Sequence, residues 1–313
     1  MALRFHAYRS NIIFMLALIF GIILPQCSPI GRILILPALA VIITITLLRF
    51  PRGFFRNPGS LFYSSLRGNL MNYLVLGNFI ILSGVFLIHK QELWVGMVLV
   101  AAMPLSLEII IMGDLLRIKK NYVFTSVAGT YLGALLILPL VALGLLKYIP
   151  EEINLNYWNI IVMILFLIVL PLLFSRIAVD HDWDVTIQQH DDIIMDYSLF
   201  VVFYAITANC RNFILNRSAD LLFIILIAFT STFLFYFIAR RIGRYFHVPQ
   251  ETINHFILPA TMKECGLAGG IALTVFSPEV AVPSLIFAVF TYIYMNWLKF
   301  RFRHLASQEN GAL

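Results

Sequence analysis

Long blocks of apolar residues are the feature of this sequence that most restricts its fold. Each block runs for roughly 15 to 25 residues, the length of helix that crosses a hydrocarbon layer about 30 Å thick. Of the 313 residues, 61% are hydrophobic and 12% are charged, whereas soluble domains carry about 25% charged residues. Because lipid cannot satisfy open strand edges, blocks of this length indicate helices. The sequence therefore predicts an all-α polytopic membrane protein that lies in a lipid bilayer.

Hydropathy predicts ten transmembrane helices. The N-terminal segment carries two arginines before its apolar run, as secretion signals do. No small-residue cleavage site follows, so we interpret this segment as a retained first span. The ten predicted spans cover residues 11–25, 30–48, 71–88, 93–114, 122–146, 158–175, 194–209, 219–239, 252–276 and 281–298.

Lysine and arginine residues predict the orientation of these spans. Sixteen fall on the side of the N-terminus and five on the opposite side, while Lys263 lies inside a span. The positive-inside rule then places both termini in the cytoplasm. The net charge of +6 is explained by cytoplasmic loops and not by a nucleic-acid partner. We expect a multi-pass protein of the cell membrane, and we take this membrane to be a bacterial inner membrane.

Spans four and nine share a pattern of proline, glutamate and glycine. Five spans precede the loop between the two halves of the chain and five follow it, so the second half must enter the membrane from the opposite side. This is an inverted repeat, which is typical of secondary transporters. The predicted organisation is a first five-helix repeat at 1–146, a linker at 147–157, a second repeat at 158–298 and a cytoplasmic tail at 299–313. The shared residues are Pro104, Glu108 and Gly113 in span four and Pro259, Glu264 and Gly266 in span nine.

Two adjacent charges, Lys263 and Glu264, interrupt the ninth span. A charge at mid-membrane costs about 2.5 to 3.5 kcal/mol on insertion scales, so each needs a partner or water. Neighbouring residues on a helix point about 100° apart, so these two cannot simply pair with each other. We expect Glu108 to pair with Lys263. Glu264 would then meet a polar group, a proton or a cation, with Na⁺ as the candidate metal.

Further residues are predicted to shape or line this site. Prolines and glycines are expected to break the helices, and freed carbonyls or hydroxyls could then bind ions. For the hydroxyl and amide side chains, helix packing is an equally good explanation. The expected helix-break positions are Pro104, Gly113, Pro259 and Gly270, and the additional candidate ligands are Cys265, Gly266, Gly269, Thr125, Ser126, Thr130 and Asn78.

The residues of the ninth span carry a family likeness. The stretch TMKECGLAGGIALTVFSPEVAVPSLIFAVF resembles the ninth-span region of the bile acid:sodium symporter family. The stretch AAMPLSLEIIIMGDLLRIKKNYVFTSVAGTYLGALLILPLVAL is similar to that family's spans four and five, and the ten-span plan covers nearly the whole chain. The positions that fit are Glu264, Gly266, Ala272, Pro278, Pro283, Ile286 and Phe287, with Pro104 and Pro139 in the earlier stretch.

The resemblance implies a core domain of helices 3–5 and 8–10, in which helices 4 and 9 are broken and cross. It implies a panel domain of helices 1, 2, 6 and 7, alternating access, and cotransport of a small organic anion with Na⁺. Where the family has Gln-Asn, the chain has Leu267 and Ala268 or the nearby glycines, and it adds Glu108 and Lys263. We therefore expect Glu108, Lys263 and Glu264 to form a titratable group that could couple transport to H⁺ in place of Na⁺.

The sequence leaves other functions open. A cation/proton exchanger with a similar crossed-helix core would also use an intramembrane lysine beside a carboxylate. A membrane receptor or scaffold that no longer transports is another alternative. A membrane-embedded metal-dependent enzyme is a further one, although we predict no enzyme activity and no cofactor other than Na⁺. The residues that could hold its divalent metal lie between spans six and seven: His181, Asp182, Asp184, His190, Asp191 and Asp192.

Overall fold

The computed structural model describes residues 2–50, 65–116, 118–145, 157–215 and 219–310. Throughout these ranges the regular secondary structure is helical, apart from one isolated β-bridge. The helices are α1 (Ala2–Ile23), α2 (Ser28–Leu48), η3 (Leu70–Gly77), α4 (Asn78–Leu87), α5 (Gln91–Ala102), α6 (Ile109–Leu115), α7 (Lys120–Leu145), α8 (Tyr157–Asp180), α9 (Trp183–Gln188), α10 (Asp191–Leu215), α11 (Ala219–Phe229), η5 (Thr230–Leu234), α12 (Phe235–Tyr245), α13 (Gln250–Ile257), α14 (Cys265–Val275) and α15 (Pro278–Asn310), with a short turn η1 (Pro25–Cys27) before α2.

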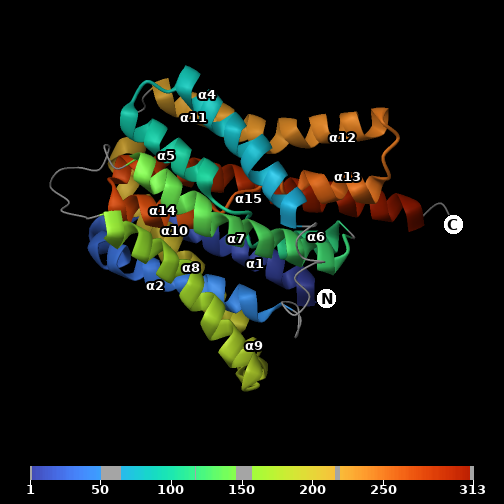
Figure 1. The fold of residues 1–313 in the computed structure, drawn as a ribbon, viewed down its shortest axis with the longest axis horizontal. Coiled ribbons are helices and arrows are strands. Elements are labelled where there is room, and N and C mark those ends of the chain that lie inside the picture. Colours follow the sequence, from blue (N-terminus) through green and yellow to red (C-terminus); the bar gives the residue numbers. More distant parts are fainter. Residues whose placement is uncertain (1, 51–64, 117, 146–156, 216–218, 311–313) are drawn as a thin grey trace.

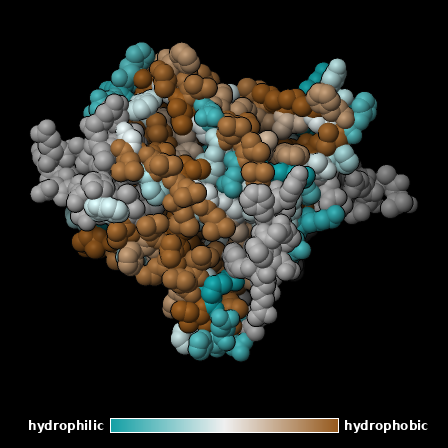
Figure 2. Space-filling view, viewed as in Figure 1, coloured by the Kyte–Doolittle hydropathy of each residue, from teal (hydrophilic) through white to brown (hydrophobic). Residues whose placement is uncertain are grey.

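The described residues contain six helices that are long and apolar enough to cross a membrane. Their outer faces carry large apolar side chains, such as Ile33, Phe86 and Leu136, which are 76%, 78% and 72% exposed. Contiguous apolar surface of this kind needs a covering partner, which lipid supplies. Figure 2 shows apolar side chains over much of one face of the molecule. The prediction of an all-α fold with several helices able to span a membrane is therefore confirmed for the described residues. The six helices are Pro25–Leu48, Ser65–Leu87, Lys120–Val141, Asp191–Leu215, Ala219–Tyr245 and Pro278–Phe302.

The helices lie side by side, with α4, α11 and α12 along one edge and α2, α8 and α9 along the other (Figure 1). Helix α10 contacts α1, α2 and α15, and α2 also contacts α8 and α14. Helix α15 packs against α5 and α14. The buried apolar side chains of nearly all these helices belong to one continuous core.

Two of the predicted apolar segments are interrupted. The segment 93–114 forms α5 and α6, separated by residues 103–108, and the segment 252–276 forms α13 and α14, separated by residues 258–264. Pro104 and Pro259 lie in these interruptions, where a proline cannot donate a helical hydrogen bond. Met103 has extended backbone angles (φ −71°, ψ 149°), as expected for a residue before proline.

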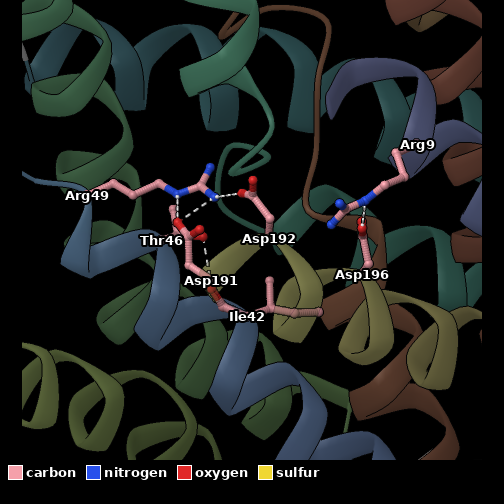
Figure 3. Close-up of polar contacts among 7 residues, drawn as sticks. All are labelled: Arg9, Ile42, Thr46, Arg49, Asp191, Asp192 and Asp196. Carbon is pink, nitrogen blue, oxygen red and sulfur yellow. Dashed lines mark hydrogen bonds and ion pairs between the residues drawn. The ribbon is translucent and has the colours of Figure 1, made fainter. Parts of the chain in front are cut away.

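The seventh predicted segment is longer than expected. We predicted 194–209, but α10 contains 25 residues from Asp191 to Leu215. The predicted segment began after Asp191 and Asp192, yet Arg49 binds both of these residues, and Arg9 binds Asp196 inside the segment. These ion pairs allow the charged turns to continue the helix (Figure 3).

Other predictions on organisation fall partly outside the described ranges. Residues 147–156 of the predicted linker lie outside them, as do Arg52, Arg56, Arg117, Lys147 and Arg217 of the basic residues used for orientation. The predicted tail at 299–313 is described as far as residue 310, and α15 runs through it to Asn310.

Candidate ion-binding site

The two interruptions lie against each other. Leu105 and Lys263 form an antiparallel bridge, and the Glu264 N–H donates a hydrogen bond of 3.0 Å to the Pro104 carbonyl. The Leu105 N–H donates to the hydroxyl of Thr130 on α7 at 3.3 Å. A break in a membrane helix frees backbone groups that lipid cannot satisfy. Here each interruption supplies partners for the other.

Glu264 is placed immediately before the first residue of α14. Its Oε2 accepts a hydrogen bond of 3.0 Å from the Leu107 N–H. The carboxylate also lies near the positive end of the α14 dipole, which stabilises a negative charge. The side chain is partly exposed, so it keeps access to the space in front of it.

Glu108 comes from the other interruption and binds side chains instead of backbone. Its Oε1 accepts a hydrogen bond from the Tyr292 hydroxyl on α15. Its Oε2 accepts one of 3.2 Å from the Ser106 hydroxyl. These two donors orient the carboxylate of Glu108 toward α15.

Lys263 does not pair with Glu108, and this prediction was wrong. Its Nζ donates to the carbonyl oxygens of Ala101 and Met103, at 2.7 and 3.0 Å, and lies 4.8 Å above the centre of the Tyr73 ring. From the sequence we expected a carboxylate as the partner of Lys263. At the end of α5, carbonyls that no helical N–H uses lie at the negative end of a helix dipole and are alternative partners for a cation.

A small cavity of about 40 Å³ lies in front of the two carboxylates. A water molecule takes about 30 Å³ in the liquid, so this space suits one water or one small ion. One wall comes from α2 and α10 and the other from the interruptions, the start of α14 and α15. The lining residues are Leu39, Ile42, Ser106, Leu107, Glu108, Met195, Leu199, Phe203, Lys263, Glu264, Cys265, Gly266, Ala288, Thr291 and Tyr292.

Ion pairs hold the α2–α10 wall together. The Arg49 guanidinium at the end of α2 binds Asp191 at 2.9 Å and Asp192 at 3.2 Å at the start of α10. Arg9 on α1 binds Asp196 one turn further along α10. Figure 3 shows both sets of contacts, with Ile42 of the cavity wall beside them.

The hydroxyl and amide candidates divide into two groups. Thr130 is fully buried and meets the interruption through Leu105. Thr125 instead donates within its own helix, to Asn121 and Tyr122. Ser126 is buried in α7, where it packs closely against the backbone of Gly68. It does not line the cavity.

Asn78 was also wrongly placed at the site. It is exposed and donates to the Leu74 carbonyl of its own helix. The buried amide of the same segment is Asn72, whose Nδ2 donates to the Met103 carbonyl at 3.1 Å. Hydropathy identifies a polar residue in an apolar helix but does not distinguish the face that points inward.

Cys265 and Gly266 line the cavity as expected, but other glycines act differently from the prediction. Gly113 lies inside α6 and Gly270 inside α14, so neither breaks a helix. A Cβ on Gly113 would lie 2.5 Å from Val123 Cγ2, and one on Gly270 would lie 2.4 Å from Leu39 Cδ1. Gly269 similarly faces Ile206 and Ser284. These glycines permit close packing between helices.

The sequence analysis missed several residues of the site. Ser106 and Tyr292 donate hydrogen bonds to Glu108. At the end of α5, Asn72 donates to the Met103 carbonyl and the Tyr73 ring faces the ammonium group of Lys263. The sequence does offer a signal for Ser106 and Asn72, because each is a polar residue in an apolar segment and lies close in the chain to a residue that we predicted for the site. The tyrosines gave no such signal, because an aromatic ring with one hydroxyl does not stand out in an apolar segment.

The acidic segment between α8 and α10 does not form a metal centre. In the described part of the chain, no group of three or more His, Cys, Asp or Glu side chains is placed to hold a metal ion. Asp191 and Asp192 bind Arg49, and His181 contacts the Ile177 carbonyl. This geometry offers no support for the metal-dependent enzyme.

Neither protein-family models nor curated protein sequences match this chain.

Proposed function

We propose that the protein is a secondary active transporter in which Glu108 and Glu264 bind the coupling ion, either H⁺ or Na⁺. The observation that carries this proposal is the meeting of two carboxylates, one from each helix interruption, at a cavity sized for one small ion. Ionisable residues at membrane depth are costly and are typical of ion pathways. Interrupted helices that meet are typical of transporter binding sites.

The proposal includes a ten-span inverted repeat, with α5–α6 as span four and α13–α14 as span nine. It also includes alternating access between two groups of helices. One group would consist of α1, α2, α8 and α10, which are linked by contacts with one another. The other would include α5, α14 and α15, which also contact one another. The cavity is lined from both groups. Relative movement of the groups would open the carboxylates to one side of the membrane and then to the other.

The transported solute is proposed to be a small organic anion, following the resemblance to the bile acid:sodium symporters. A second cavity, of about 720 Å³, has the size of a small-molecule site. Its lining is almost entirely apolar and comes from α1, α10, α11 and α15, with Leu18, Thr207 and Ile286 among its residues. It could hold the apolar part of such a solute.

One observation favours the cation/proton exchanger as a second candidate. The ammonium group of Lys263 is bound to the Ala101 and Met103 carbonyls. The charged groups left to meet a ligand in the small cavity are therefore the two carboxylates. This arrangement suits a cation better than an anion.

The first experiment measures the melting temperature of the purified protein in detergent. Na⁺ is exchanged for K⁺ at fixed ionic strength, from pH 5.5 to 8.5. A bound ion raises stability by mass action. We expect either a Na⁺-specific rise or a pH dependence in the wild type, and we expect it to disappear in Glu264→Gln. The matched control is Glu92→Gln, which changes an exposed glutamate at the start of α5. Wild-type protein that responds to neither ion would contradict the proposal.

A second experiment separates the two candidates. The protein is reconstituted into vesicles that contain a pH-sensitive dye, and a Na⁺ or K⁺ gradient is imposed. Proton flux driven by the cation gradient alone identifies an exchanger. Flux that requires an added organic anion identifies a symporter. In both cases, Glu264→Gln should abolish the flux and Glu92→Gln should leave it intact.

A further inference from the structure

We propose that the carbonyl-lined end of α5 is a monovalent-cation site that the chain fills with the ammonium group of its own Lys263. This inference goes beyond the transport function and does not rest on it, because it concerns a different set of contacts from the Glu108–Glu264 cavity.

The ammonium group is held as a bound cation would be held. Its nearest partners are the carbonyl oxygens of Ala101 and Met103, at 2.7 and 3.0 Å. The face of the Tyr73 ring lies 4.8 Å away. Carbonyl oxygens and ring faces are both electron-rich and attract cations.

The site is enclosed and built by several elements. Lys263 is only 3% exposed and Asn72 is 0% exposed. Gly77 brings the η3 backbone against the ammonium group, since a Cβ there would lie 3.8 Å from Lys263 Nζ and 3.1 Å from the Ala101 carbonyl oxygen. A larger residue than glycine would crowd the carbonyl that the ammonium group uses.

Two further features of the site favour a cation. Asn72 donates its Nδ2 to the Met103 carbonyl, whereas its buried Oδ1 has no hydrogen-bond partner. The site also lies at the C-terminal end of α5, where the helix dipole favours a positive charge. Buried acceptors of this kind are costly when they are left unsatisfied. The lysine supplies the charge that would otherwise have to come from a free ion.

A tethered ammonium group has a different consequence from a free ion. A free Na⁺ or K⁺ binds and dissociates, so stability would follow its concentration. Lys263 is covalently attached, so this site is filled at any salt concentration. Removing the side chain should therefore convert a permanently filled site into one that binds cations from solution.

The test compares Lys263→Ala with the wild type and with Lys90→Ala, which removes the exposed lysine that precedes α5 and lies over the Phe213 ring. Thermal unfolding is measured at constant ionic strength with Na⁺, K⁺, NH₄⁺ or methylammonium as the probe. N-methyl-D-glucamine, which is too large for the site, balances the ionic strength. We expect Lys263→Ala to melt below the wild type. We expect at least one small cation to recover several degrees of the loss with a saturating dose response, while the other two proteins do not respond.

Two results would overturn the proposal. One is a Lys263→Ala protein that melts like the wild type. The other is a destabilised protein that responds to the small cations no more than to N-methyl-D-glucamine.

If Lys263→Ala does not yield folded protein, Lys263→Gln and Lys263→Met provide the comparison. Glutamine can donate its amide N–H groups to the carbonyls but carries no charge, whereas methionine fills the space without a donor. The proposal requires wild type to be more stable than Lys263→Gln, and Lys263→Gln to be more stable than Lys263→Met. Equal stability of the three proteins would show that the carbonyls need no donor, and the proposal would fail.

Discussion

The backbone N–H of Leu107 donates a hydrogen bond of 3.0 Å to the carboxylate of Glu264, a residue 157 positions further along the chain. This bond joins the interruption of one apolar segment to the interruption of another. It fixes one oxygen of Glu264, a residue that lines the small cavity. The geometry explains why a charged residue can be tolerated here and why it can still bind an ion.

The hydrogen bond to Leu107 predicts different effects for two substitutions of Glu264. Glu264→Gln keeps a carbonyl oxygen that can accept from the Leu107 N–H, so we expect nearly wild-type folding in the absence of a bound ion. Glu264→Ala leaves that N–H unpaired, which should lower the free energy of unfolding by about 1–3 kcal/mol. Thermal unfolding in detergent measures both variants. If Glu264→Ala is as stable as Glu264→Gln, the hydrogen bond does not contribute. Glu92→Ala, at an exposed position, serves as the control.

The Tyr292 hydroxyl holds Glu108 in place, so Tyr292→Phe should act at the site and not only on packing. We expect a loss of about 1–2 kcal/mol, as for hydrogen bonds between membrane helices. We also expect a changed response of the melting temperature to Na⁺ or pH. Tyr245→Phe is the matched control, because Tyr245 is 77% exposed at the end of α12. An unchanged ion response in Tyr292→Phe would show that Glu108 needs no orientation by this hydroxyl.

Gly96 allows α5 to approach α15 closely. A Cβ at this position would lie 2.3 Å from the Val280 carbonyl oxygen and 2.8 Å from Pro283 Cγ. Backbone and proline atoms cannot move aside easily, so Gly96→Ala should cost about 1–3 kcal/mol, as overpacking does. Gly144→Ala in α7 should be neutral or slightly stabilising, because nothing lies within 4 Å of its Cβ. The two variants are compared by thermal unfolding, and equal melting temperatures would argue against the close α5–α15 contact.

The contact between Arg49 and Asp191 predicts a small coupling that depends on salt. Arg49 is partly exposed, so the pair should contribute no more than about 1 kcal/mol. A double-mutant cycle with Arg49→Gln and Asp191→Asn measures the coupling. It should fall as ionic strength rises. Arg244→Gln, which changes an exposed arginine of α12, should show no coupling to Asp191→Asn. A coupling that salt does not change would contradict an electrostatic origin.

Much of the helical architecture follows from local features that a sequence displays. Blocks of apolar residues fix helical membrane segments, because lipid leaves the backbone few alternatives. Pro104 and Pro259 mark the two interruptions, because proline removes a helical donor and restricts the residue before it. Glu108 and Glu264 were identified as site residues because charges in apolar segments are too costly to be incidental.

The sequence alone determined that this chain forms apolar helices, that two of its segments are interrupted and that unusual charges lie at the interruptions. Only the tertiary structure decided the partner of each charge. Lys263 binds the Ala101 and Met103 carbonyls and not Glu108, while Glu108 binds Tyr292. It also decided that Asn72 faces inward and Asn78 outward. Hydropathy records how polar a residue is. Its partner depends on the rotation of each helix and on how closely the helices pack, and both are set by contacts between residues far apart in the chain.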